Sequence, residues 1–328
     1  MGDLYLNKKI EIKYSMPQYY VFNLEYSITK DKTTPFPNKV NLGSEFSDFE
    51  TLFKEKPIAV TLANNHILDY GKQGFENTIN TLKDKGIKYI GAGCEKDNYN
   101  NRQVIDLNDS KVSVLSYSQF KMEADGLGVA LAEKERIIKD INQAKSNGAT
   151  AVIVCIHWGT EDHPCQNSYQ EEMGRFMVDS GADLVIGNHT HCVQPFVKYK
   201  DKYIFYSVGN FFFENINTEC FYDEKGKSKR KWRKRNLRCN KTAYVVLYDT
   251  VKKQVCRVDE LINNGKTVVF NKNKDLNKTY SVNKNLGRVI YAMRKYGGFL
   301  TSNMFVDNKF FDFDAIKHEL NIKVSNKN

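Results

Sequence analysis

Four apolar stretches of the sequence end in residues that can bind a metal ion. The residues at these ends are Glu25, Asn65, His66, His157, His189 and His191. Ligands in open α/β sheets collect at the carboxyl ends of strands, so we expect these side chains to lie close together. His189 and His191 are the strongest signal, because the chain has only six histidines and a spacing of two places both imidazoles on one face of an extended segment.

The types of these side chains indicate the chemistry. Imidazole nitrogens combined with amide and carboxylate oxygens suit Mn, Fe or Zn, whereas an all-oxygen set would suit Mg or Ca. Three histidines, one asparagine and one or two carboxylates are enough for a dinuclear site. Two such ions share a bridging water whose pKa falls toward neutrality, and this water becomes a nucleophile. The pattern therefore predicts a metal-dependent hydrolase.

Each candidate also has an ordinary structural interpretation. A single histidine after a strand more often forms structural hydrogen bonds than binds a ligand. His163 and His318 are interpreted in that way, and Asn65 alone carries little signal in a chain this rich in asparagine. The metal hypothesis rests on the combination and not on one residue.

The elements that must position these residues alternate between strand and helix. Apolar runs predict strands at 58–63, 87–93, 112–117, 151–156 and 183–186, and helical spacing predicts helices at 74–86, 133–148 and 168–181. After residue 203 strands follow one another without helices. This indicates an α/β body over 1–275 and a small C-terminal helical appendage over 276–328.

Composition narrows the class of protein. Hydrophobic content of 41% and charged content of 27% are ordinary for a globular protein. A basic loop inserted at 225–238 holds nine Lys or Arg and no acid, and so carries most of the net charge of +10. One basic loop with one Trp is not a recognised nucleic-acid module, so nucleic acid is not an expected partner. The loop could instead attract an anionic substrate.

The sequence gives little indication of a targeting segment or of disulfide bonds. No apolar run reaches the roughly 20 residues that cross a bilayer, and no leader is evident, so we expect a cytoplasmic protein. The seven cysteines are odd in number and lack CxxC pairs, which argues against a disulfide framework and against a structural zinc site.

Several segments together resemble a known family. They are NLE at 23–25, LANNHILDYGKQGFENTINTLKDKGIKYIGAG at 62–93, HWG at 157–159, DLVIGNHTHCVQPF at 183–196 and YSVGNF at 206–211. In this order they resemble the CapA family of capsule and poly-gamma-glutamate biosynthesis proteins, which is related to the calcineurin-like metallophosphoesterases. The resemblance covers roughly residues 2 to 215.

The resemblance implies a four-layer αββα sandwich with a metal centre at its strand ends. It implies six metal ligands, with Glu25 in the bridging position: Asp3, Glu25, Asn65, His157, His189 and His191. His66 is similar to the histidine that protonates the leaving group, and Asp69 is placed to orient it. Where the related phosphoesterases have Asp-x-His, this chain has Asp3-Leu4-Tyr5, so one metal position loses an imidazole.

Substrate contacts and the reaction are less closely specified. Asn23, Asn210, Arg235 and Arg238 are predicted to contact substrate. The leading hypothesis is a phosphoesterase in capsule or poly-gamma-glutamate biosynthesis that acts on an anionic substrate such as a phosphosugar or a polyglutamate chain. Hydrolysis of a gamma-glutamyl amide at the same metals is one alternative. A non-catalytic component that binds other capsule synthesis proteins is another, and a polyanion-binding protein is a third.

Overall fold

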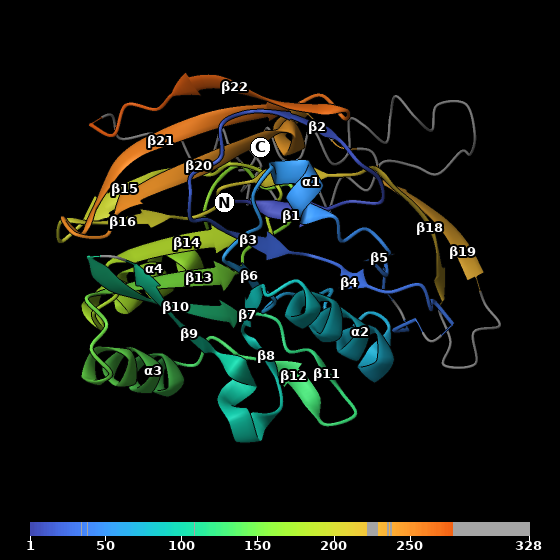
Figure 1. Ribbon diagram of the computed structural model, residues 1–328, viewed down its shortest axis with the longest axis horizontal. Coiled ribbons are helices and arrows are strands. Elements are labelled where there is room, and N and C mark those ends of the chain that lie inside the picture. The colour runs from blue at the N-terminus through green and yellow to red at the C-terminus, as the bar shows by residue number, and fades with distance from the viewer. Residues whose placement is uncertain are drawn as a thin grey trace, which may run out of the picture.

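The computed structural model describes residues 1–33, 35–37, 39–107, 109–221, 229–234, 236 and 238–277, although not the side chains of 217–221, 229–234 and 238. Two large sheets form its centre (Figure 1). The first has five parallel strands in the order β17 (Asn210–Phe213), β1 (Asp3–Tyr5), β3 (Val21–Leu24), β6 (Ala59–Thr61) and β7 (Lys88–Ile90).

The second large sheet has six strands. Their order is β15 (Phe196–Tyr199), β16 (Lys202–Phe205), β14 (Leu184–Asn188), β13 (Ala151–His157), β10 (Ser110–Ser118) and β9 (Arg102–Leu107). The four inner strands are parallel, and β9 and β15 are antiparallel edges. Strand β13 reads as an almost continuous apolar run because both faces of the sheet are covered.

Helices cover the outer faces of both sheets, and the inner faces pack on each other. Helix α2 (Gly71–Asp84) buries Phe75, Ile79 and Leu82 in the core of the five-stranded sheet. Helices α3 (Lys134–Ser146) and α4 (Ser168–Asp179) cover the six-stranded sheet. Apolar residues of both sheets, including Ala59 and Val114, share one further cluster between them. The predicted αββα sandwich is therefore confirmed.

Smaller elements surround this sandwich. A four-stranded sheet joins β2 (Glu11–Lys13), β22 (Thr267–Asn273), β21 (Gln254–Asn263) and β20 (Thr242–Asp249). Short pairings involve β4 (Ser27–Ile28) with β5 (Gly43–Ser44), and β11 (Glu123–Ala124) with β12 (Leu127–Val129) and β8 (Ala92–Gly93). Short helical segments are α1 (Phe49–Phe53), η1 (Glu95–Asn100), which is kinked, and η2 (Arg238–Lys241).

The segment expected to be a basic loop is in part a β-strand. Strand β19 (Lys229–Lys234) pairs antiparallel with β18 (Ile216–Phe221), so the centre of the basic stretch is a two-stranded ribbon and not a loop. Residues 222–228 lie outside the described residues, as does the predicted appendage beyond residue 277. The domain boundary near residue 275 therefore stays a prediction.

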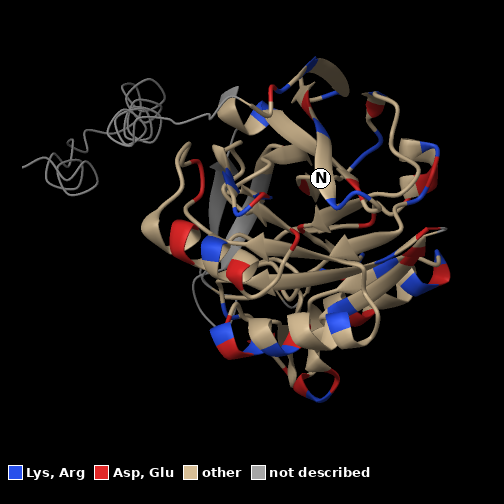
Figure 2. Cartoon of the chain, turned by 90° about the vertical axis from the view of Figure 1, so that its left-hand side faces the viewer, with Lys and Arg blue, Asp and Glu red and all other residues tan. Residues whose placement is uncertain are grey.

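Charge on the described part of the chain is mixed. Figure 2 shows lysines, arginines and acids interspersed on the outer helices and loops, while the central strands are largely without charge. Within the described residues, no helix has the length and apolar character needed to span a membrane.

Candidate metal centre

Parallel strands bring the predicted ligands to one edge of the two sheets. Glu25 directly follows β3, and His157 is the last residue of β13. His189 directly follows β14, and Asn65 lies in the turn after β6. All four side chains come from segments far apart in the sequence, and the parallel registers place their carboxyl ends together.

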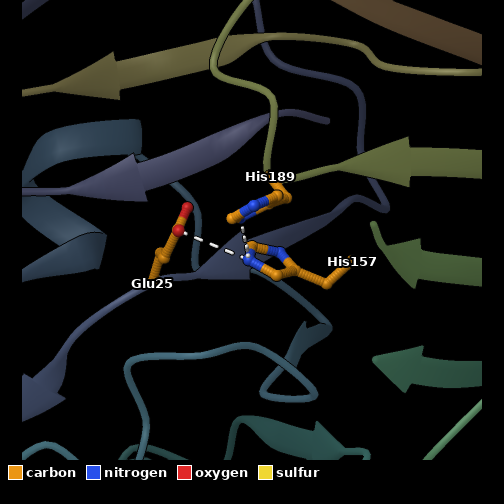
Figure 3. A group of neighbouring side chains, drawn as sticks. All are labelled: Glu25, His157 and His189. Carbon is orange, nitrogen blue, oxygen red and sulfur yellow. Dashed lines mark hydrogen bonds and ion pairs between the residues drawn. The ribbon is translucent and has the colours of Figure 1, made fainter. Parts of the chain in front are cut away.

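The imidazole of His157 lies at the centre of the first ligand group (Figure 3). Its Nε2 lies 2.8 Å from Asn65 Oδ1, 3.0 Å from His189 Nδ1 and 3.4 Å from Glu25 Oε1. Ligand atoms bound at about 2.0–2.2 Å to one transition metal ion are separated by distances of this size. The group is thus arranged for a shared cation.

A second group contains Asp3, Glu25 and His191, and it shares Glu25 with the first group. His191 Nδ1 lies 3.7 Å from Asp3 Oδ2, and His191 Nε2 lies 3.9 Å from Glu25 Oε1. Strand β1 lies between β3 and β17, with Asp3 level with Asn23 and Asn210. The three side chains are buried.

The two neighbouring histidines converge for a reason other than the predicted one. His189 and His191 have φ angles of 88° and 57°, so neither continues the extended chain of β14. Positive φ is uncommon for non-glycine residues and clusters at functional sites. Both imidazoles face the same site, as expected, but the turn and not strand alternation brings them there: His189 lies against His157 and His191 against Asp3.

The electrostatics of the centre favour a bound cation. Burial lowers the pKa of His157 well below its ordinary value, and the imidazoles of His189 and His191 lower it further. The pKa of Asp3 is raised by burial and lowered in part by His191 and Asn23. Neutral imidazole nitrogens with carboxylate and amide oxygens form the mixed donor set of Mn, Fe or Zn sites. The residues present therefore fit divalent transition metal ions.

His66 and Asp69 form a buried pair beside the centre. His66 Nδ1 lies 2.6 Å from Asp69 Oδ2, and the Nδ1–H of the ring donates to this carboxylate. Burial lowers the pKa of His66, and the Asp69 carboxylate raises it in part. His66 follows Asn65 directly, and its imidazole is near enough to His157 to contribute to lowering the pKa of His157.

The structure shows the side chains of two of the four residues predicted to contact substrate. Asn23 is buried and donates to Asp3 Oδ1 at 2.8 Å, so it holds a predicted metal ligand. Asn210 is also buried, and its Oδ1 lies 2.9 Å from His191 Nδ1. Arg235 and the side chain of Arg238 lie outside the described residues, and their contacts with substrate stay predictions.

Sequence reasoning missed three residues that hold the site. Asn64 donates to Asn23 Oδ1 at 3.1 Å and accepts from the His66 backbone N–H at 2.9 Å. Asn240 donates to the carbonyl of His191 at 3.2 Å. Lys39 lies 2.5 Å from Asp69 Oδ1. The adjacent asparagines of ANNH could have indicated Asn64, but nothing in the spacing indicated the other two.

Comparison with curated proteins finds relatives that are named for capsule or PGA biosynthesis. The chain is 34% identical over 168 residues to the capsule biosynthesis protein CapA of Bacillus anthracis, covering 47% of this chain and 40% of the relative. It is 29% identical over 212 residues to the PGA biosynthesis protein CapA of Bacillus subtilis (strain 168), covering 62% and 56%. The chain spans about half the length of these curated relatives.

Solved structures superpose only loosely. A phosphatase of Mycoplasma pneumoniae has a TM-score of 0.44 at 12% identity, covering 83% of this chain and 89% of that one. A hypothetical protein from Thermus thermophilus has a TM-score of 0.40 at 11% identity, covering 81% and 95%. Neither superposition adds to what the geometry shows.

The model of the family described as bacterial capsule synthesis protein PGA_cap matches residues 10–215. The match includes Glu25, Asn65, His157, His189 and His191 and leaves Asp3 outside. Since it covers more than half of the 328 residues, the chain belongs to the bacterial capsule synthesis family PGA_cap.

Proposed function

We propose that this chain is a metal-dependent hydrolase of capsule or polyglutamate biosynthesis, and that it acts first of all as a phosphoesterase. One observation carries the proposal: Glu25 belongs to two ligand groups, so one carboxylate can bridge two cations. Ions held about 3.5–4 Å apart in this way are typical of hydrolytic two-metal sites. The proposed metals are Mn, Fe or Zn.

The residues of the chain have separate roles in this proposal. One ion would be held by Glu25, Asn65, His157 and His189, and the other by Asp3, Glu25 and His191. When bound, the metals supply Lewis acidity toward an anionic substrate and a water of lowered pKa. His66, oriented through Nδ1 by Asp69, moves a proton at Nε2 to the leaving oxygen or nitrogen.

A gamma-glutamyl amide is the second candidate substrate. It is favoured by the relatives, since one is named for PGA biosynthesis in Bacillus subtilis and another is named a probable polyglutamine synthesis accessory protein in Mycobacterium tuberculosis. The same site can serve either bond, because phosphoryl and acyl transfer both need charge stabilisation and a proton donor. Other capsule synthesis proteins are proposed partners.

Hydrolysis assays on metal-loaded protein test the proposal. Purified protein would be loaded with Mn, Fe or Zn, its metal content measured, and an aryl phosphate, phosphosugars and gamma-glutamyl peptides offered in parallel. We expect about two ions per chain and release of phosphate. Release of glutamate alone would establish the amide reaction. Protein that holds metal but cleaves nothing would favour a binding or assembly role, and protein that takes up no metal would overturn the proposal.

A further inference from the structure

Asp69 is a buried carboxylate that needs more than His66 as a partner. Its side chain is 0% exposed. Oδ2 lies 2.6 Å from His66 Nδ1 and accepts from the backbone N–H of Leu42, also at 2.6 Å. Both donors act on the same oxygen, which leaves the charge at Oδ1 to be compensated. Burying a carboxylate without such compensation is strongly unfavourable.

Lys39 supplies that compensation. Its ammonium lies 2.5 Å from Asp69 Oδ1, with the lysine side chain 20% exposed. In the part of the chain that the structure describes, no group donates a hydrogen bond to this oxygen, and its partner is the ion pair with Lys39. The ammonium also donates to the backbone carbonyl of Asn65. One lysine thus contacts both the orienting carboxylate and the backbone of a predicted metal ligand.

The segment around Lys39 is held in place by its own contacts with Asp69. The backbone N–H of Phe36 donates to the Asp69 carbonyl at 2.7 Å. The side chain of Asn41 donates to the carbonyls of Phe36 and Lys39 at 2.9 and 3.1 Å. Because Leu42 and Lys39 contact different oxygens of Asp69, the carboxylate cannot rotate without losing one of them.

The geometry points to Lys39 as a positioning residue that acts through Asp69. It keeps Oδ2 aimed at His66 Nδ1, which holds the imidazole with its proton on Nδ1 and presents Nε2 to the substrate. Lys39 also contacts the backbone of Asn65. This contact keeps the His66 imidazole at a fixed position relative to the first ligand group. The catalytic part of this inference rests on the proposed hydrolase function.

The test compares Lys39→Met with Lys39→Arg in zinc-loaded protein. The control is Lys202→Met, which removes a half-buried lysine at 2.6 Å from Asp183, remote from the site. The first readout is the NMR signal of the His66 Nδ1 proton, assigned by its loss in His66→Asn. We expect Lys39→Met to lose or shift it, and Lys39→Arg and Lys202→Met to keep it.

The second readout is kinetic. Lys39→Met should lower kcat by about 10–100-fold, the usual effect of losing a residue that orients a ligand or an active-site side chain, with KM and zinc content little changed. A large rise in KM with the proton signal intact would overturn the inference and make Lys39 a substrate-binding residue. Equal behaviour of Lys39→Met and Lys202→Met would also overturn it.

A double variant covers the case in which Lys39→Met does not fold. Asp69→Asn with Lys39→Met leaves neither buried charge unpaired and should fold. Because Lys39 acts through Asp69, adding Lys39→Met to Asp69→Asn should change kcat by less than about 2-fold, a non-additive result. A further large loss would contradict the inference. If wild-type protein cleaves nothing, the proposed function fails while the proton signal still decides the role of Lys39.

Discussion

Asn210 Oδ1 accepts a hydrogen bond from His191 Nδ1 at 2.9 Å. The amide cannot flip without loss, because its Nδ2 donates to the carbonyl of Asn240 at 3.3 Å. The proton of His191 therefore lies on Nδ1, and Nε2 keeps its lone pair on the side of Glu25. Such partners fix the tautomer and orientation of metal-binding histidines.

Replacing Asn210 by Ala should weaken metal binding without unfolding the protein. The expected loss of affinity is about 10–100-fold, since the imidazole of His191 loses the acceptor that orients it. Competition with a chromophoric chelator measures it. Equal affinity in wild type and Asn210→Ala would show that Asn210 does not orient His191.

The two histidines of the turn should control different ions. His189→Ala removes a member of the first ligand group and His191→Ala a member of the second. Each variant should therefore retain one ion, whereas Glu25→Ala should lose both. Metal analysis of dialysed protein distinguishes these cases. His163→Ala, which changes a histidine that contacts the Cys165 backbone, is the control and should retain both ions.

Changes to the His66 and Asp69 pair should separate turnover from metal binding. His66→Asn removes the proposed proton donor and should lower kcat by about 10²–10⁴-fold, the range for general acid catalysis. The metal content should stay at the wild-type level, because neither residue belongs to the ligand groups. Wild-type turnover by His66→Asn would exclude His66 as the proton donor.

Gly209 is required where β17 begins. Its φ is +69°, and an added Cβ would lie 2.4 Å from the carbonyl oxygen of Thr242. Gly209→Ala should therefore destabilise the fold by more than Gly148→Ala, since Gly148 has a similar φ of +83° and open space around it. Urea unfolding should give about 1–2 kcal/mol for Gly148→Ala from backbone strain alone. Equal losses would show that the Thr242 contact is relieved at no cost.

The strands that carry most of the predicted ligands could be recognised in the sequence because they are buried on both faces. The run from Ala151 to Ile156 is apolar throughout, and His157 is the first polar side chain after it. The alternation of strands and helices indicated an α/β domain, and the four-layer order was implied by the resemblance. Local pattern thus indicated which residues stand at strand ends, and parallel pairing brought those ends together.

Other features depend on contacts that no local pattern encodes. The pairing of β1 with β17 joins Asp3 to Asn210 across most of the described chain. His189 and His191 have positive φ angles, and no glycine at either position indicates them. Lys39 lies in a segment without helical or strand periodicity, and its role depends on where Asp69 lies in space.

The pairing of Asp3 with Asn210 also limits how early during synthesis the second ligand group can form. A ribosome must translate β17 before Asp3 and His191 can be held together, and at about 5–20 residues per second this takes about 10–40 s. Nascent chains that stall or are cut before that point would carry exposed histidines without a formed cation site. Under the proposed function, an ion of the second ligand group would therefore bind only after β17 has been made.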